Sequence, residues 1–291
     1  MNRRIFLTIA GSDPSGGAGI QADIHTAIAH GLDPCSVITA ITAQNTSKFE
    51  GSRAVDPDTI EAQLRSVLSD IRPDAVKIGM LPNAEAVKRI ADLIREFELF
   101  NVVLDPMLSP TLSSSEPDKN LIGALCKEML PVATVVTPNV AEMELLEKTC
   151  GESLDEVCPA VLVTAGHTEG KNIVDRLLLN VHASNPDNSP STAFPTINFN
   201  HSALYDFNKI LPNEEGIGES KVEVVEFTHP RIDSENTHGT GCILSSAIAC
   251  NLANGYILEK AVKNAINFTE EALRKAKDFK LGKGNYGPAL I

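Results

Sequence analysis

The chain lacks a long apolar segment, paired cysteines and basic runs, and each absence excludes a class of protein. No stretch approaches the roughly eighteen uncharged apolar residues of a membrane helix. The opening sequence, MNRRIFLTIAGSDPSG, has two arginines but only a short apolar run, which does not fit a secretory leader. We therefore expect neither a membrane span nor export.

The six cysteines are scattered, and none forms a CxxC pair. Since 291 residues can bury a large core without cross-links, this pattern favours reduced thiols over a disulfide framework. A reducing compartment is implied, and we expect the cytoplasm. The seven histidines lack zinc-ligand spacing, so the sequence does not indicate zinc.

Positive charge is scarce, and the formal net charge is -13. Such a charge repels polyanions at long range, and no Lys/Arg run offsets it, so we expect no nucleic-acid partner. A small molecule that carries phosphate would have to be held by helix N-termini, by clusters of backbone N–H groups or by a divalent cation.

Short apolar runs rich in β-branched residues alternate with longer amphipathic stretches, which is typical of a mostly parallel sheet. The predicted strands are Ile5–Ala10, Ser36–Ala43, Ala75–Ile78, Val102–Leu104, Thr134–Thr137 and Val161–Thr164. The predicted helices are Gln21–His30, Thr59–Asp70, Ala84–Glu98, Asn120–Met129 and Val140–Lys148. Such crossovers place helices on both faces of the sheet, so we predict one α/β domain over residues 1–291. Its site should lie at the carboxyl ends of the strands.

Periodicity is lost between Gly170 and Glu219, where NVHASNPDNSPSTAFPTINFN is rich in Asn, Ser and Pro. We interpret residues 170–220 as a surface insertion. We expect Asn185–Phe199 to be mobile, because this composition buries too little apolar surface to offset the ordering entropy. Regular structure should resume with a strand at Val222–Phe227 and helices at Thr240–Asn254 and Glu259–Lys277.

The glycine-rich motif GSDPSGGAGIQAD follows the first predicted strand and opens a helix. Its glycines let the backbone approach a ligand closely. Its spacing matches neither GxGxxG nor the Walker motif, which argues against both of those nucleotide-binding loops. A ligand-binding loop and an ordinary flexible turn both remain open.

A second motif, NTHGTGC, precedes a helix of small residues. The backbone N–H groups of Gly239, Thr240 and Gly241 at a helix N-terminus would form an anion hole suited to a transferring phosphoryl group. The same field would lower the pKa of the Cys242 thiol, which could then orient or accept a substrate hydroxyl proton. The competing interpretation is that Cys242 is a small core residue.

Five further candidate residues follow predicted strands. In TPNVAE, Asn139 and Glu142 spell a capping box, which explains both without chemistry, but Glu142 could also hold Mg²⁺ together with Asp105 of VVLDPM. Gln44 could read the edge of a heterocycle and Met80 could contact its face. Each could equally be an ordinary loop residue.

The segments AGSDPSGGAGIQAD, TAQNT, KIGML, LDP, TPNVAE and NTHGTGC occur in an order and spacing that resemble hydroxymethylpyrimidine/phosphomethylpyrimidine kinases of the ribokinase-like superfamily. The resemblance runs from about Ile5 to Tyr286 outside the insertion, and NLANGY is most similar to fungal members. It implies a ribokinase-like three-layer α/β/α fold. It also implies ATP- and Mg²⁺-dependent phosphorylation of the pyrimidine and then of its monophosphate in thiamin biosynthesis, and it suggests a homodimer.

The resemblance also implies roles for the matching residues. The pyrimidine pocket would comprise Gly11, Asp23, Gln44 and Met80. The anion hole and the catalytic cysteine would be Gly239, Gly241 and Cys242. The ATP contacts would be Asn139, Thr164 and Thr240, and the Mg²⁺ and phosphate region would comprise Asp105 and Glu142. Because the residue chemistry and the resemblance meet at the same positions, we favour a functional Cys242.

Three departures from the family pattern bear on activity. VTAGH stands where VKGGH is usual, so Thr164 replaces a lysine expected near the ATP phosphates. The segment after Asp105 lacks the glycine of the family's flap, which bears on its closing motion. Lys148–Ala160 is shorter, and the insertion at residues 170–220 longer, than is usual in the family.

Two alternatives therefore stay open. Pyridoxal kinase acts on a ring that also bears a hydroxymethyl group, although Gln44 favours the aminopyrimidine. A catalytically weak paralogue that binds the pyrimidine would be consistent with Thr164 and the altered segment.

Overall fold

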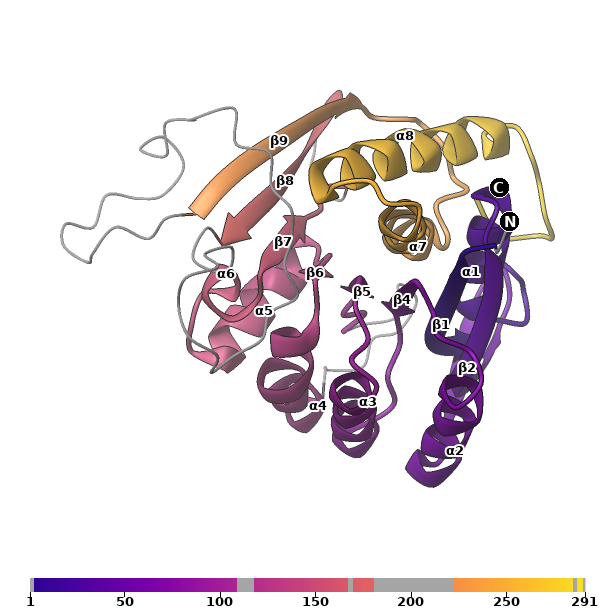
Figure 1. Cartoon of the computed structure of the whole chain (residues 1–291). Coiled ribbons are helices and arrows are strands. Elements are labelled where there is room, and N and C mark those ends of the chain that lie inside the picture. The colour runs from indigo at the N-terminus through magenta and orange to yellow at the C-terminus, as the bar shows by residue number, and fades with distance from the viewer. Residues whose placement is uncertain (1–2, 109–117, 167–169, 181–221, 285–286, 290) are drawn as a thin grey trace.

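The structure, a computed structural model, describes residues 3–108, 118–166, 170–180, 222–284, 287–289 and 291. Within this range, nine strands form one sheet in the order β3-β2-β1-β4-β5-β6-β7-β8-β9 (Figure 1). The strands are β1 (Ile5–Ser12), β2 (Asp33–Gln44), β3 (Phe49–Ala54), β4 (Ala75–Ile78), β5 (Val102–Leu104), β6 (Val135–Val136), β7 (Ala160–Val163), β8 (Asn172–Asn180) and β9 (Val222–Pro230).

The centre of this sheet is parallel. Strands β2, β1, β4, β5, β6 and β7 pair in parallel, whereas β3 is antiparallel to β2, β8 to β7 and β9 to β8. The carboxyl ends of the parallel strands therefore meet along one edge, and the prediction of a mostly parallel sheet is confirmed.

Helices cover both faces of the sheet (Figure 1). One face packs against α1 (Gly19–Ala29), α7 (Thr240–Ala253) and α8 (Leu258–Ala276). The other packs against α2 (Pro57–Leu68), α3 (Ala84–Glu96), α4 (Lys119–Ala124), α5 (Val140–Cys150) and α6 (Leu154–Val157). After α4 the chain continues as a π turn, Leu125–Met129, and a 3₁₀ turn, Leu130–Val132. The predicted three-layer α/β/α fold is confirmed.

Local sequence explains where several elements begin and end. The side chains of Asp56 and Asn83 accept hydrogen bonds from backbone N–H groups of the first turns of α2 and α3. Gly151, with φ 78°, ends α5 in the left-handed conformation that glycine adopts without steric cost. The short strands β4 and β5 are buried along their whole length, and Lys77 is their only charged residue.

The predicted strands at Ala75–Ile78 and Val102–Leu104 match β4 and β5 at both ends. The polar strand β3 was missed, because its residues lack apolar alternation. The insertion prediction needs a boundary correction, since β8 occupies residues 172–180, where it buries alternate apolar side chains. Residues 181–220, including Asn185–Phe199, lie outside the described residues, so the mobility of Asn185–Phe199 stays a prediction.

One cysteine prediction is wrong. Cys126 and Cys150 form a disulfide, whereas Cys35, Cys158, Cys242 and Cys250 are free. The π turn and α5 pack together and bring the two Cα atoms within 5.5 Å, a proximity that a sequence separation of 24 does not reveal. The pair lacks CxxC spacing, so no local motif indicates it.

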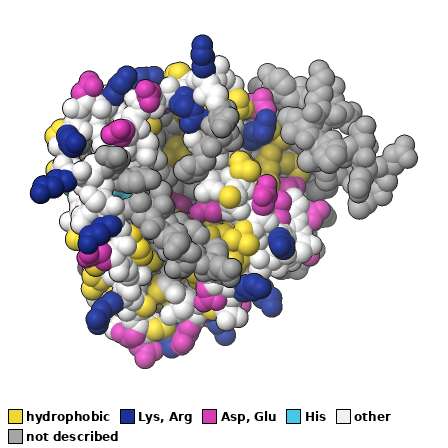
Figure 2. Space-filling model, turned by 180° about the vertical axis from the view of Figure 1, so that it is seen from behind, with side chains coloured by type: hydrophobic (Ala, Val, Ile, Leu, Met, Phe, Trp, Pro, Cys, Tyr) yellow, Lys and Arg dark blue, Asp and Glu magenta, His cyan; other side chains and the backbone are white. Residues whose placement is uncertain are grey.

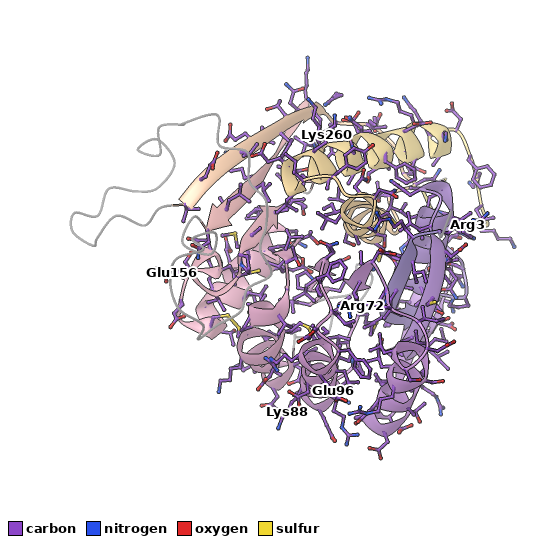
Figure 3. All side chains as sticks on the ribbon, viewed as in Figure 1. Arg3, Arg72, Lys88, Glu96, Glu156 and Lys260 are labelled. Atoms are coloured by element: carbon purple, nitrogen blue, oxygen red, sulfur yellow. A yellow bond between two sulfur atoms is a disulfide. The ribbon has the colours of Figure 1, made fainter. Side chains whose placement is uncertain are left out.

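The visible face of the molecule in Figure 2 carries interspersed acidic and basic side chains. Figure 3 shows charged side chains that point outward, such as Lys88 of α3 and Lys260 of α8. None of the helices in the described part of the chain is long and apolar enough to cross a membrane.

Candidate active site

A pocket of about 380 Å³ lies at the carboxyl edge of the parallel strands. Each of these strands, or the residues that follow it, supplies part of the wall: Gly11 of β1, Gln44 of β2, Met80 after β4, Asp105 after β5, Asn139 after β6 and Thr164 after β7. The pocket therefore lies at the edge of the sheet where the sequence predicts the site. The N-terminal end of α7 closes the opposite wall with Gly239, Thr240, Gly241 and Cys242.

The end of α7 is held against the first glycine-rich loop. Gly239 has φ 81°, and a Cβ there would lie 1.8 Å from the carbonyl oxygen of Gly17, so only glycine fits. His238 Nε2 lies 2.9 Å from Asp13 Oδ2, which also accepts the N–H of Ala18. Asp13 and His238 thus tie together two motifs that are 225 residues apart.

The anion hole differs in one detail from the prediction. The N–H of Thr240 already donates to the carbonyl of Thr237 at 3.3 Å. Within the described residues, the N–H groups of Gly241 and Cys242 have no hydrogen-bond partner, as expected for the first turn of a helix. These two groups, together with the helix field, can bind a phosphoryl oxygen.

Cys242 is buried in the first turn of α7, and its Sγ lies 3.9 Å from Sδ of Met107. Met107 has φ 36°, a left-handed conformation that is uncommon for a residue with a side chain. Burial raises the pKa of the Cys242 thiol to about 12, because desolvation outweighs the opposing charge of Lys77. The prediction of a lowered thiol pKa is therefore wrong, and the free protein holds a neutral thiol here.

The two predicted Mg²⁺ ligands follow adjacent strands: Asp105 comes directly after β5, and Glu142 lies in the first turn of α5, which follows β6. The capping box of α5 is present: Asn139 Oδ1 accepts the N–H of Glu142, and Glu142 Oε2 accepts the N–H of Asn139, both at 3.0 Å. Glu142 Oε1 also accepts the N–H of Leu108 at 3.2 Å. The described residues hold no group of three or more His, Cys, Asp or Glu side chains that could bind a metal by itself.

Even so, negative charge accumulates between Asp105 and Glu142. Burial, and then the charge of Asp105, raises the pKa of Glu142 to about 7. Burial likewise raises the pKa of Asp105, which accepts a hydrogen bond from Ser245 Oγ at 3.3 Å. The two buried carboxyl groups repel each other when both are ionised, and a bound cation would relieve this repulsion. Such a cation would take its remaining ligands from water and phosphate oxygens.

The predicted pyrimidine residues fall into two groups. Gly11, Gln44 and Met80 line the pocket, and a Cβ on Gly11 would lie 3.3 Å from Met80 Sδ. Asp23 lies beneath the wall and is fully buried by Lys77, Thr8 and Ser246. The structure therefore does not support a direct contact between Asp23 and the substrate.

Thr164 lies at the other end of the pocket and hydrogen-bonds to Pro138 through its backbone N–H. Beyond it, His229 of β9 lies between two carboxylates. Its Nε2 is 3.1 Å from Asp175 of β8, and its Nδ1 is 3.2 Å from Glu270 of α8. The hydrogen bond to Asp175 raises the pKa of His229 against the effect of burial.

Seven charged or titratable residues that line the pocket were not among the predicted site residues: Asp13, Lys77, Asp175, His229, Arg231, His238 and Glu270. Two of them lie inside motifs noted in the sequence, Asp13 in GSDPSG and His238 in NTHGTGC, where the glycines suggested a backbone role and not a side-chain one. Of the seven, Lys77 carries the clearest sequence signal, because a charged residue interrupts an otherwise apolar strand.

The phosphomethylpyrimidine kinase family model matches residues 13–193 and 217–289. The chain is 34% identical over 298 residues to the hydroxymethylpyrimidine/phosphomethylpyrimidine kinase of Escherichia coli K12, covering 98% of this chain and 96% of that protein. It is 36% identical over 294 residues to a chloroplastic thiamine biosynthetic bifunctional enzyme of Arabidopsis thaliana, covering 97% and 49%. The chain thus spans about half the length of that plant relative and of a similar one from rice.

A solved structure with the same fold is the ADP complex of Bacillus subtilis pyridoxal kinase. Its TM-score is 0.73 at 29% sequence identity, and the match covers 99% of this chain and 97% of the other. The predicted ribokinase-like architecture agrees with this neighbour.

Proposed function

The chain belongs to the phosphomethylpyrimidine kinase family, and on that premise we propose that it uses ATP to phosphorylate 4-amino-5-hydroxymethyl-2-methylpyrimidine and then the resulting monophosphate. The observation that carries the proposal is that one pocket joins Gly11, Gln44 and Met80 to the N-terminal end of α7. It brings groups suited to a heterocycle face to face with groups suited to phosphate.

In the proposed reaction, the hydroxymethyl oxygen forms a bond to the γ-phosphorus while the bond from that phosphorus to the ADP oxygen breaks, and one proton is released. The N–H groups of Gly241 and Cys242 would hold the phosphoryl oxygens. Cys242 lies in the same turn, where its thiol would orient the substrate hydroxyl group. Because the resting thiol is neutral, we assign Cys242 first to positioning and only then to proton acceptance.

Asp105 and Glu142 would hold Mg²⁺, since their oxygen atoms, burial and mutual repulsion fit a divalent cation. When bound, the cation neutralises phosphate charge. Asn139 and Thr164 would contact ATP. In the free protein, Asn139 caps α5 and the backbone N–H of Thr164 donates to the carbonyl of Pro138.

The remaining assignments extend the same proposal. We place the activity in the cytoplasm, in one kinase domain over residues 1–291 with an insertion after β8, and without a nucleic-acid or membrane partner. A homodimer and a fungal-type origin stay predictions from the sequence resemblance.

Pyridoxal kinase is the second candidate, because a solved neighbour at 29% identity has that activity. The Gln44 amide at the pocket wall favours the aminopyrimidine, whose ring edge offers both donors and acceptors. A non-catalytic pyrimidine-binding protein is the third candidate. It would be favoured if the end of the pocket near Thr164, without the family's lysine, had too little positive charge to support turnover.

Product formation with ATP and Mg²⁺ separates these three functions when hydroxymethylpyrimidine, its monophosphate and pyridoxal are compared at equal concentration. The proposal expects the highest kcat/KM for the two pyrimidines. Preference for pyridoxal would establish the second candidate. Tight pyrimidine binding without product would establish the third.

A further inference from the structure

Lys77 is the only lysine or arginine that is buried among the described residues. It lies in β4 between Val76 and Ile78, and its side chain is 0% exposed. Other lysines, such as Lys88 and Lys260, point outward (Figure 3). A charge at this depth needs a specific reason, because desolvation disfavours it strongly.

Asp23 of α1 compensates the charge of Lys77. Nζ of Lys77 lies 2.9 and 3.1 Å from the two carboxylate oxygens of Asp23. The same carboxylate accepts hydrogen bonds from Thr8 Oγ1 at 2.6 Å and from Ser246 Oγ at 2.8 Å. Four elements, β1, α1, β4 and α7, thus converge on one buried ion pair directly below the α7 terminus.

Stability alone does not account for this pair. Well-packed apolar residues in place of a buried ion pair are often as stable or more stable, and the rest of β4 is apolar. The chain also leaves room for the ammonium group: a Cβ on Gly79 would lie 2.9 Å from Nζ of Lys77. The absence of a side chain at Gly79 therefore leaves the space that the Lys77 ammonium group occupies.

The position of Lys77 relates it to the candidate site. It borders the pocket although it is fully buried, so it influences a ligand through the electric field and not by exposed contact. Burial would lower the pKa of Lys77, but the neighbouring carboxylate of Asp23 acts against burial and the pKa is raised, so the group stays cationic. Within the described residues, Asp23 is its only hydrogen-bond partner.

We propose that Lys77 is a positioning residue for phosphoryl transfer, whose buried charge keeps the α7 end of the pocket electropositive beside Asp23 and Asp105. In this role it favours negative charge on the transferring phosphoryl group and on the substrate oxygen near Cys242. This inference rests on the proposed kinase function. It explains why a costly buried pair lies under the anion hole and not elsewhere in the core.

The test compares Asp23→Asn with the double variant Asp23→Asn/Lys77→Met, which differ only in the Lys77 charge. Asp23→Asn leaves a buried cation without its counterion and should lower the melting temperature. The double variant carries no buried charge and should recover stability. Under the proposal, its single-turnover transfer rate is nevertheless at least about 10-fold below that of Asp23→Asn, with an unchanged KM for the pyrimidine.

The order of stability is therefore expected to be opposite to the order of rate. If the ion pair had only a structural role, the transfer rate would follow the stability of each variant. A double variant that is as fast as Asp23→Asn, or as fast as the wild type, therefore overturns the inference. Should Asp23→Asn fail to fold, the comparison of the double variant with the wild type decides. Lys88→Met, at an exposed lysine of α3, is the matched control and should change neither quantity. A wild-type protein without pyrimidine kinase turnover would instead refute the proposed function.

Discussion

Removal of the Glu142 charge is expected to stabilise the free protein above neutral pH. Burial and the neighbouring Asp105 raise the pKa of Glu142 from 4.5 to about 7. Between these two pH values the folded chain keeps a proton that the unfolded chain releases, so stability falls as pH rises. Each pH unit corresponds to about 1.4 kcal/mol, which gives a loss of about 3 kcal/mol between pH 4.5 and pH 8.

The assay is urea unfolding from pH 4.5 to pH 8 in EDTA, for the wild type and Glu142→Gln. Glutamine resembles the protonated side chain, so the two proteins should be about equally stable at pH 4.5. At pH 8 the variant should be more stable by about 3 kcal/mol. Glu144→Gln is the matched control, because Glu144 is exposed on the same helix, and it should run parallel to the wild type.

Addition of Mg²⁺ tests the function of the same charge. At pH 8 and a concentration ten times the dissociation constant, Mg²⁺ should stabilise the wild type by about 1.4 kcal/mol and Glu142→Gln by much less. If the difference between wild type and Glu142→Gln did not change from pH 4.5 to pH 8, the argument from burial would be refuted. If Mg²⁺ stabilised both proteins equally, Glu142 would not be a ligand.

Three further predictions use other residues. Gln44→Leu should lower kcat/KM for the pyrimidine by roughly 10- to 1000-fold while ATP binding persists, and an unchanged kcat/KM would remove Gln44 from the ring site. Cys242→Ser should lower kcat by about 10²-fold with little change in KM for ATP. Because the pKa of Cys242 is about 12, alkylation of this thiol in the wild type should be slow at pH 7 and accelerate up to pH 9. If Cys242→Ser had the wild-type kcat under conditions where chemistry limits turnover, Cys242 would be a core residue without a catalytic role. Cys150→Ser removes the disulfide and should cost about 3 kcal/mol of stability in non-reducing buffer, because the two cysteines are 24 residues apart. In dithiothreitol, which reduces the disulfide of the wild type, the substitution should cost nothing. Equal loss in both buffers would assign the effect to packing.

The sequence was sufficient to predict the fold class and the edge of the sheet where the pocket lies. Buried parallel strands such as Ala75–Ile78 are short apolar runs, and the residues that follow them must meet at one edge. Eleven of the twelve predicted site residues line one pocket for this reason, and only Asp23 does not. The roles assigned to them stay predictions that the experiments above address.

Other features depend on tertiary contacts that no local pattern encodes. The ion pair between Lys77 and Asp23 spans 54 residues, and the contact between Asp13 and His238 spans 225. The pKa of Cys242 illustrates the same limit. Its place in the first turn of a helix is visible in the sequence and argues for a lowered pKa, whereas the burial that raises it comes from elements far along the chain.

The charges around the pocket explain how an acidic chain could bind a phosphate donor. Five carboxylate residues line it, namely Asp13, Asp105, Glu142, Asp175 and Glu270, whereas Lys77 and Arg231 are the only lysine and arginine among its described lining residues. Thr164 adds no positive charge where the family pattern has a lysine. Under the proposed function, phosphate charge must then be balanced by the N–H groups of α7, by a divalent cation and by the field of Lys77. A pocket of this composition should depend more steeply on Mg²⁺ than one that retains the lysine, and restoring it with Thr164→Lys should lower the Mg²⁺ concentration needed for half-maximal turnover.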